Sequence, residues 1–254
     1  MIESKTFCGF VAIVGRPNVG KSTLMNHLIG QKISITSRKP QTTRHRVTGV
    51  YTKDDTQYLF VDTPGFQKQY LTKLNQALNQ SVVNSLGNVD AIIYVVEAGI
   101  FNIGDEEVLN LLPTEANVIL VINKRDKYKD RNELNQFVKE VSKKYPFKKV
   151  LSVAAKHDHG MDELLAATKL YLPESVFLYP EEQLSDKSSR FMASEIIREK
   201  LFRSLGEELP YSLMVEIDKF EQTNKLSRVF ATIIVDRENQ KPMIIGKGGE
   251  KLKK

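Results

Sequence analysis

The stretch that decides the fold reads Gly15-Arg16-Pro17-Asn18-Val19-Gly20-Lys21-Ser22. It matches the phosphate-loop pattern G-x-x-x-x-G-K-[ST] in full, directly after an apolar run and at the start of a helical pattern. Glycines let the backbone wrap around phosphate groups, so that successive N–H groups and the helix N-terminus converge on the oxygens. In such a loop Lys21 supplies a positive charge to the β- and γ-phosphates, and the Ser22 hydroxyl binds Mg²⁺. The stretch therefore predicts a strand–loop–helix unit that binds a nucleoside phosphate.

The residues around this loop alternate between short apolar runs and helical patterns. The expected strands are rich in β-branched residues and bounded by Gly, Asp, Asn or Pro: Phe10–Val14, Tyr58–Val61, Ala91–Val96, Val118–Ile122 and Val150–Val153. The expected helices are Lys21–Ile29, Leu71–Leu86, Asp105–Leu111, Arg131–Lys144 and Met161–Tyr171. Val47–Thr52 adds an edge strand that pairs with Tyr58–Val61. This alternation predicts an α/β fold with a mainly parallel sheet and with ligand loops at the carboxyl ends of the strands.

The pattern changes after this first domain, which we place at residues 1–172. Residues 173–189 contain two prolines and no sustained periodicity, and we interpret them as a linker. In residues 190–254 a helix is predicted by apolar side chains that recur every four positions: Ala193, Ile197, Leu201 and Leu205. Apolar and polar residues then alternate at 211–217 and 229–235, as in two half-buried strands. Helix, strand, strand and a Gly-rich turn predict a second domain of α+β type.

Composition narrows the class of protein further. The net charge of +6 favours a polyanionic partner such as RNA. Cys8 is the only cysteine, so an intramolecular disulfide is impossible and a reducing compartment fits. The longest apolar stretch, Ala91–Phe101, contains Glu97 and is about half a membrane span. The amino terminus lacks the pattern of a signal peptide. We therefore expect a soluble, cytoplasmic protein.

A second motif of the first domain completes the predicted metal site. Residues 62–65 have the form D-x-x-G and close the strand Tyr58–Val61. The Asp62 carboxylate is placed to hold Mg²⁺ through water, and the Gly65 N–H is placed to contact a γ-phosphate. Alone the pattern is common by chance, and its position at a strand end is what gives it weight.

A third motif selects the base. Residues 123–126 have the form N-K-x-D and follow the strand Val118–Ile122. The Asp126 carboxylate can accept hydrogen bonds from N1–H and the exocyclic amine of guanine. Adenine offers neither group at that edge and would leave the carboxylate unpaired. Lys124 can lie along the base, and Asn123 can tie the loops together, so the expected nucleotides are GTP and GDP.

These motifs resemble the G boxes of the translation-factor-related GTPases over the first two-thirds of the chain. The resemblance implies hydrolysis of GTP to GDP and phosphate, with Mg²⁺ as cofactor. It also implies a threonine between the first two boxes that caps Mg²⁺ and the γ-phosphate. Thr43 is favoured because it directly precedes Arg44, with Thr42 as the alternative. The catalytic residues implied are thus Lys21 and Thr43, and the metal ligands are Ser22, Thr43 and Asp62.

Two positions depart from the family pattern. Ala154-Ala155-Lys156 stands where the family has Ser-Ala-Lys, so a supporting hydroxyl is lost, while the backbone N–H expected to contact guanine O6 is that of Ala155. Phe66 stands where Ras-like GTPases have a glutamine that orients water, and slow intrinsic hydrolysis is expected. Some GTPases with a hydrophobic residue there recruit K⁺ through an asparagine at the position of Asn18. An ordinary structural role for Asn18 is the equal alternative.

The nucleotide-binding residues expected in total are Gly15, Arg16, Pro17, Asn18, Val19, Gly20, Lys21, Ser22, Thr23, Asp62, Gly65, Asn123, Lys124, Asp126, Ala154, Ala155 and Lys156.

The second domain carries a G-x-x-G turn after a short apolar segment. The turn resembles that of a type II KH domain, in which it clamps the backbone of single-stranded nucleotides. The RNA-binding residues implied are Ile245, Gly246, Lys247, Gly248 and Gly249. The sequence stops at Lys254, inside the expected second helix of such a domain, so this domain is expected to be incomplete.

A G domain followed by a KH domain resembles the bacterial GTPases of ribosome assembly. The resemblance implies a nucleotide-controlled switch that acts as a monomer, binds the 3′ end of 16S ribosomal RNA and assists assembly of the 30S subunit. It also implies a peripheral contact with the inner membrane. Two alternatives stay open: an RNA-binding assembly factor for which GTP is only a ligand, and a related GTPase acting on tRNA or the large subunit.

Overall fold

The computed structural model describes residues 5–36, 43–66, 73–128, 130–205, 213–223 and 226–253. Its internal contacts divide the chain into two units. The first unit comprises residues 1–34 and 43–186, and the second comprises residues 35–42 and 187–254.

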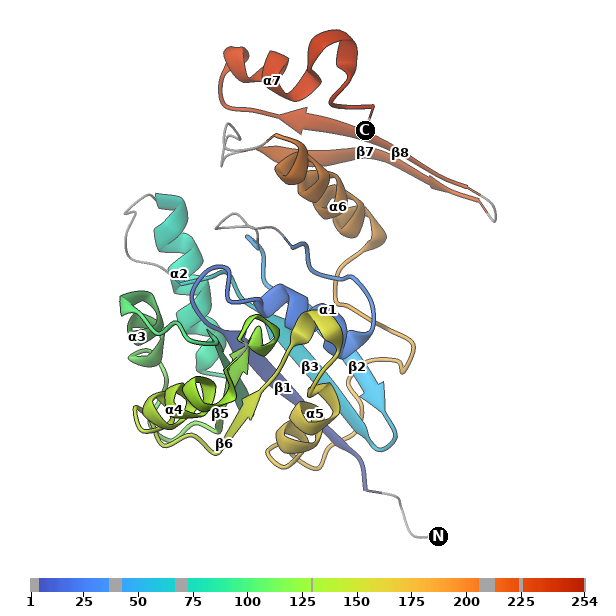
Figure 1. Cartoon of the computed structure of the whole chain (residues 1–254). Helices are drawn as coiled ribbons and strands as arrows, with labels where there is room; N and C mark the ends of the chain where they lie inside the picture. Colours follow the sequence, from blue (N-terminus) through green and yellow to red (C-terminus); the bar gives the residue numbers. More distant parts are fainter. Residues whose placement is uncertain are drawn as a thin grey trace. The chain divides into compact units, whose positions relative to one another are not determined.

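A six-stranded sheet forms the centre of the first unit (Figure 1). Its strands are β1 (Phe7–Val14), β2 (Val47–Lys53), β3 (Thr56–Asp62), β4 (Ala91–Glu97), β5 (Val118–Asn123) and β6 (Lys149–Ser152). The order is β2-β3-β1-β4-β5-β6, and only the β2–β3 pair is antiparallel. The predicted α/β fold with a mainly parallel sheet is confirmed, and so is the edge strand.

Helices cover both faces of this sheet, as its continuous apolar strands require. They are α1 (Lys21–Ile29), α2 (Lys73–Leu86), α3 (Ile103–Leu109), α4 (Arg131–Ser142) and α5 (Met161–Lys169). Buried residues of α2, α3 and α4 share one core cluster with alternate residues of β1, β4 and β5. Helix α1 contacts β2, β3 and α5. The parallel strands therefore all end at one edge, where their loops meet.

Several elements differ from the predicted bounds by one to three residues. Strand β1 begins at Phe7 instead of Phe10, because Phe7 to Phe10 continue the parallel register with β3. Helix α3 begins at Ile103, ahead of the predicted Asp105, because Asn102 caps it and Asp105 closes a capping box. The helix predicted from Leu71 is described from Lys73.

The predicted linker is bound to the first unit up to Asp186. The Gln57 side chain accepts hydrogen bonds from the backbone of Leu178 and Tyr179 at 2.9 and 3.0 Å and donates to the Tyr179 carbonyl at 2.8 Å. Asp186 accepts from the Thr48 N–H at 2.9 Å. These bonds pair the segment with the edge of the sheet, so most of it is an ordered strap.

The second unit contains α6 (Ser189–Ser204), β7 (Met214–Gln222), β8 (Ser227–Ile234) and the short α7 (Lys241–Ile245) (Figure 1). Strands β7 and β8 form an antiparallel pair. Its core joins the helices to the strands through Leu201, Phe202, Leu205, Leu213 and Ile244. The predicted order of helix, strand, strand and glycine turn is confirmed.

Within the described ranges, no helix is both long enough and apolar enough to cross a membrane. Nor do three or more His, Cys, Asp or Glu side chains gather there in a way that could hold a metal ion.

Candidate functional site

The phosphate loop needs its glycines for space as well as for conformation. Gly15 and Gly20 have φ of 157° and 103°. A Cβ on Gly15 would lie 2.4 Å from the Val95 carbonyl oxygen, and one on Gly20 would lie 2.4 Å from Asn123 Nδ2. Two strand ends therefore pack directly against the loop backbone, and any side chain at either glycine would push the loop out of place.

Lys21 is held inside this loop. Its Nζ donates to the carbonyls of Gly15 and Arg16 at 3.0 and 2.9 Å. Burial lowers the pKa of Lys21 to about 8, and the nearby Asp62 carboxylate opposes that shift. Phosphate oxygens at the loop would favour the charged form, because opposite charges at short range stabilise each other. The ammonium group is therefore positioned for an anion before any anion binds.

Three oxygen-bearing side chains converge beside Lys21. The Ser22 hydroxyl lies 3.0 Å from Thr43 Oγ1 and donates to Asp62 Oδ2 at 2.9 Å. Thr43 Oγ1 is 3.4 Å from the same carboxylate oxygen. The structure thus brings together the three predicted metal ligands, although they lie on different elements. Thr42, the alternative to Thr43, lies outside the described residues.

The Asp62 carboxylate suits a cation as its partner. It is fully buried, and burial raises its pKa, although hydrogen bonds from hydroxyl groups and the charge of Lys21 counteract the effect. Its Oδ1 has no hydrogen-bond partner among the described residues. Mg²⁺ prefers hard oxygen ligands and few protein groups, so this donor set suits it.

One member of this cluster escaped the sequence analysis. The Ser34 hydroxyl donates to Asp62 Oδ2 at 2.6 Å. Asn26 holds Ser34 in place, because its Oδ1 accepts from the N–H groups of Ile33 and Ser34. A serine outside any motif gives no sequence signal, so only the fold reveals this contact.

Asn123 ties three loops together. Its Nδ2 donates to the Val19 carbonyl in the phosphate loop at 2.9 Å, and its Oδ1 accepts from the Ala155 N–H at 3.1 Å. The N–H that we expected to contact guanine O6 is thus engaged by Asn123. The neighbouring Lys156 is exposed and Ala154 is buried. The base loop and the phosphate loop form one hydrogen-bonded frame.

Lys124 spans the same two loops. Its backbone is left-handed, with φ of 63°, and its Nζ donates to the Asn18 carbonyl at 2.6 Å. The same Nζ lies 2.7 Å from Glu97 Oε2 at the end of β4. Asn18 also has a positive φ, of 66°. The Lys124 side chain is therefore held in place by the phosphate loop on one side and by the end of β4 on the other.

Glu97 is the centre of an ion-pair network that the motifs do not reveal. Besides Lys124 it pairs with Lys127 at 3.2 Å and with Arg16 of the phosphate loop at 3.6 Å. Arg16 also pairs with the fully buried Asp105 at 2.9 Å. Burial penalises the charged form of Glu97, but the two lysines outweigh it and lower its pKa. The network connects the phosphate loop to the base loop through two carboxylates.

Glu97→Gln should weaken the binding of GDP by roughly tenfold. The change keeps the side-chain volume but leaves three cations without their shared charge, and a charged hydrogen bond contributes about 1.5–3 kcal/mol. Displacement of a fluorescent GDP analogue measures the effect. Glu106→Gln is the matched control, because Glu106 pairs with Lys144 on an exposed surface. Equal affinities of the two variants would contradict a positioning role for Glu97.

Asp126 lies in a short 3₁₀ turn, Arg125–Lys127, just after Lys124. His157 Nε2 lies 3.6 Å from its Oδ2, a neighbour that the sequence analysis did not pair with it. His157 ends the turn that follows Ala154. The carboxylate is exposed and stands beside the frame made by Asn123, as a base-reading group requires.

The loop after β3 packs on the phosphate loop. The Thr63 hydroxyl donates to the Ile13 carbonyl at 2.8 Å, and a Cβ on Gly65 would lie 2.8 Å from the Pro17 backbone. Phe66 is buried in the core cluster beneath α2. The phenyl ring thus anchors the loop and presents no polar group to a water molecule. Thr23, the last predicted loop residue, is half-buried in α1.

The glycine turn of the second unit is exposed. Gly246, Gly248 and Gly249 all have positive φ, of 73°, 63° and 79°. Ile244 is buried beneath the turn, whereas Ile245 and Lys247 face solvent. Turn backbone, one cation and one exposed apolar side chain are thus presented together, and they suit the phosphates and bases of a single strand.

Comparison with known proteins identifies both units. Residues 10–124 match the family described as "50S ribosome-binding GTPase", and residues 208–254 match the family described as "KH domain". GTPase Era of Chromobacterium violaceum is 57% identical over 254 residues, covering all of this chain and 86% of that protein. GTPase Era of Neisseria meningitidis serogroup B is 58% identical over 249 residues, which are 97% of this chain and 81% of that protein.

Two solved structures share the fold. One is Era in complex with MgGDPNP and nucleotides 1506–1542 of 16S ribosomal RNA, with a TM-score of 0.91 and 38% identity over 98% of this chain and 85% of that chain. The other is a variant of Aquifex aeolicus Era bound to GDP·AlF4⁻, with the same TM-score, identity and coverage.

The phosphate loop, the metal-site side chains and the base loop, followed by the glycine turn, define a P-loop GTPase joined to a KH domain. The sequence relatives narrow that class to one family, because they match this chain over the GTPase unit and the KH unit together. The chain belongs to the Era family of GTPases. The resemblance inferred from its motifs is confirmed.

Proposed function

We propose that this Era-family GTPase hydrolyses GTP at the described site, binds the 3′ end of 16S ribosomal RNA and assists 30S assembly in a nucleotide-controlled way. The observation that carries the proposal is the meeting of Ser22, Thr43 and Asp62 beside the buried Lys21. Thr43 comes from outside the phosphate loop and the D-x-x-G motif, yet its hydroxyl lies 3.0 Å from Ser22 Oγ. A γ-phosphate contact by Thr43 would therefore couple the bound nucleotide to the position of the segment around Thr43.

The chemistry requires charge stabilisation more than covalent participation. Lys21 and the backbone N–H groups of the phosphate loop would stabilise the charge that develops on the transferred phosphoryl group. Ser22 and Thr43 would hold Mg²⁺ directly and Asp62 would hold it through water, and the ion would neutralise the phosphate oxygens. Gly65 would donate its N–H to the γ-phosphate. Since Phe66 cannot orient water, intrinsic turnover would be slow.

The base would be read beside the frame built by Asn123. Asp126 would accept from guanine N1–H and the exocyclic amine, and Lys124 would cover one face of the ring. An O6 contact from the Ala155 N–H would have to share that hydrogen with Asn123. The remaining loop residues would bind as expected from the sequence, and K⁺ would bind near Asn18 as a second cofactor.

RNA would bind at Ile245, Gly246, Lys247, Gly248 and Gly249. The exposed turn and its cation support this assignment, together with the family match. We further propose a G domain over residues 1–172 and an RNA-binding domain over residues 190–254, joined by residues 173–189, of which those up to Asp186 pack on the first unit as the strap. We also propose a monomeric and cytoplasmic protein with peripheral contact with the inner membrane.

Lys21→Ala and Ser22→Ala test the active site. Each should lower Mg²⁺-dependent phosphate release from GTP by about 10²–10³-fold, because each removes a charged contact to the phosphate or a metal ligand. Lys148→Ala, on an exposed loop before β6, serves as the control. Wild-type turnover in either variant would show that the phosphate loop has been misassigned.

A further inference from the structure

The positive charge of this chain is concentrated in its first third. Residues 4–89 contain eleven Lys or Arg and three Asp or Glu, a net charge of +8, whereas the whole chain carries +6. The rest of the molecule is therefore slightly acidic. An excess of this kind favours a polyanionic partner. Part of it is neutralised within the fold, because Lys21 is buried and because Lys5, Arg16 and Lys53 pair with acids from later in the chain. Arg46, at the start of β2, is in none of these pairs.

The three acids of this region do not offset the charge near the metal site. Asp62 is buried. Asp54 and Asp55 lie in the β2–β3 turn, and Asp55 already accepts two hydrogen bonds from Lys169 at 2.6 and 2.8 Å. That turn is about 20 Å from the start of β2, at the usual rise per residue of a strand. Residues 4–89 therefore place no acid on the surface around the start of β2. The Asp186 carboxylate of the strap does lie there, where it accepts from the Thr48 N–H at 2.9 Å.

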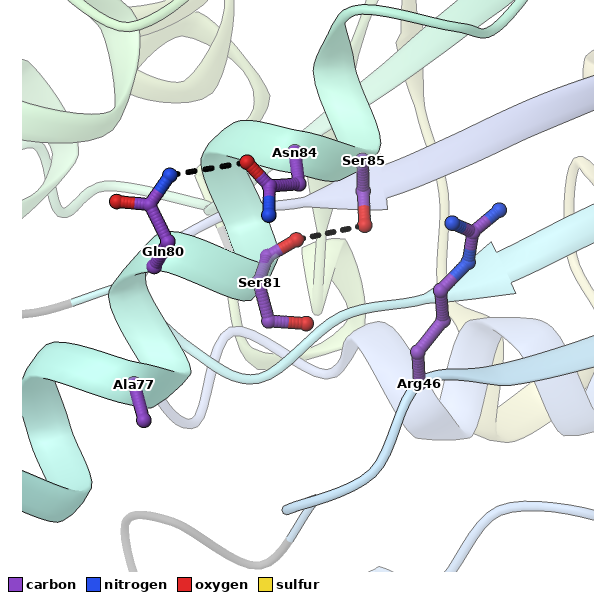
Figure 2. A pocket seen from close by; sticks show the side chains of 6 residues that line it. All are labelled: Arg46, Ala77, Gln80, Ser81, Asn84 and Ser85. Carbon is purple, nitrogen blue, oxygen red and sulfur yellow. Dashed lines mark hydrogen bonds between the residues drawn. The ribbon is translucent and has the colours of Figure 1, made fainter.

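A cavity of about 420 Å³ opens on this surface, lined by Arg46, Ala77, Gln80, Ser81, Asn84 and Ser85. Figure 2 shows Gln80, Ser81, Asn84 and Ser85 along α2, with Arg46 opposite them on the segment that leads into β2. Among the residues that the structure describes, no carboxylate lines it. Its walls therefore present one guanidinium group, amides and hydroxyls.

The hydrogen bonds within the lining leave donors available. Gln80 Nε2 donates to Asn84 Oδ1 at 2.9 Å, and Ser85 donates to the Ser81 carbonyl at 2.7 Å (Figure 2). The two N–H groups of the Asn84 amide and the hydroxyl of Ser81 remain available as hydrogen-bond donors. Neither has a hydrogen-bond partner in the portion of the chain that the structure describes. Together with Arg46 they form a donor set for an anionic oxygen.

Both walls are attached to the predicted γ-phosphate contacts. Arg46 follows Thr43 by three residues, and Thr43 lies in the Ser22–Asp62 cluster. Helix α2 is the first helix after Gly65. Movement of either contact on GTP hydrolysis would change the separation of the walls. The cavity is therefore built from the two segments that should respond to the nucleotide.

We propose that this cavity binds a phosphodiester group of RNA in the GTP state, as a contact on the G domain separate from the glycine turn. Arginine, amide and hydroxyl donors are the groups that contact RNA and DNA backbones without reading sequence. A short acidic peptide is less suited, because one cation would have to serve several carboxylates. This inference rests on the proposed function, because it takes ribosomal RNA as the partner of the chain.

Binding of 16S ribosomal RNA with MgGDPNP tests the cavity. Arg46→Gln and Asn84→Asp should each weaken binding roughly five- to tenfold, and Arg46→Gln should lower the salt slope by about one. Basal GTP turnover should not change. Arg131→Gln and Asn132→Asp on α4 are matched controls, since they make the same changes at exposed positions. Equal affinity of the cavity and control variants would overturn the proposal, and so would an equal loss with MgGDP.

The glycine-turn variant Lys247→Asp with Gly248→Asp separates this inference from the proposed function. Wild-type affinity in that variant beside a loss in Arg46→Gln would support the cavity and reject the turn. The reverse pattern would reject the cavity alone. A benzophenone attached at Asn84→Cys should also cross-link to 16S ribosomal RNA when 30S subunits are irradiated with MgGDPNP. A cross-link to ribosomal protein only would overturn the proposal.

Discussion

Asp126→Asn should reverse the nucleotide preference from GTP to XTP. The asparagine amide would donate to the oxygen that xanthine carries where guanine carries its amine. A site built to hydrogen-bond a substrate group rejects an analogue without it by about 10⁴-fold or more, so the reversal should be large. Competition of GTP and XTP for a fluorescent GDP analogue measures it. The turn Arg125–Lys127 should stay intact, because the N–H groups of Lys127 and Tyr128 close it by donating to the carbonyls of Lys124 and Arg125.

Asp130→Asn is the control for this experiment. Asp130 caps α4 through its side chain, and asparagine caps a helix about as well as aspartate. It lies four residues away and undergoes the same chemical change. An unchanged preference for GTP in Asp126→Asn would remove Asp126 from the base site.

Lys247→Asp combined with Gly248→Asp should abolish binding of the 1506–1542 segment of 16S ribosomal RNA that a related Era holds. Two carboxylates would face the phosphates, and the added side chain would block close approach of the backbone. The fold should tolerate the change. A Cβ at Gly248 meets nothing within 4 Å, and aspartate is one of the residues that accept its φ of 63°.

Gel-shift and phosphate-release assays on one preparation measure both units at once. Intrinsic GTP turnover should remain near wild type, since Thr43 and all the expected nucleotide-binding residues belong to the first unit. Gln136→Asp with Lys139→Asp, on the exposed side of α4, makes the same change in net charge and is the control. RNA binding that survives in Lys247→Asp with Gly248→Asp would reduce the turn to a plain helix connection.

The motifs predicted the central sheet well because each strand of a parallel sheet is buried on both faces. Short, continuous apolar runs such as Ala91–Val96 and Val118–Ile122 are typical of such strands. The boundaries were less certain, since they depend on capping and register. Asn102 and Asp105, for example, close a capping box that starts α3 earlier than its apolar pattern suggests.

Contacts between distant residues could not be predicted. Glu97 and Arg16 belong to different strand ends, and nothing in their local sequence indicates that they pair with each other. Their further partners, Lys124 for Glu97 and Asp105 for Arg16, are equally unmarked. Ser34 reaches Asp62 only because Asn26 turns the chain after α1. Such pairs form where loops from different strands meet at one edge of the sheet. Sequence periodicity cannot predict them, because it describes one helix or strand at a time.

The strap after α5 is a further case. Prolines and the absence of periodicity predicted a linker but not its contacts: a buried strand residue, Gln57, supplies hydrogen bonds that hold residues 178 and 179. The polar Gln57 side chain within an apolar strand was the only feature of the sequence that could have indicated these contacts. Its burial requires partners, and the strap provides them.

The central claim is that the nucleotide controls RNA engagement. Its most direct test is the affinity for the 1506–1542 RNA segment, measured with MgGDPNP and again with MgGDP. A coupling of the usual size for two linked sites predicts tighter binding with MgGDPNP by about 5- to 150-fold. Equal affinities in the two nucleotide states would contradict the switch and leave an RNA-binding assembly factor for which GTP is only a ligand.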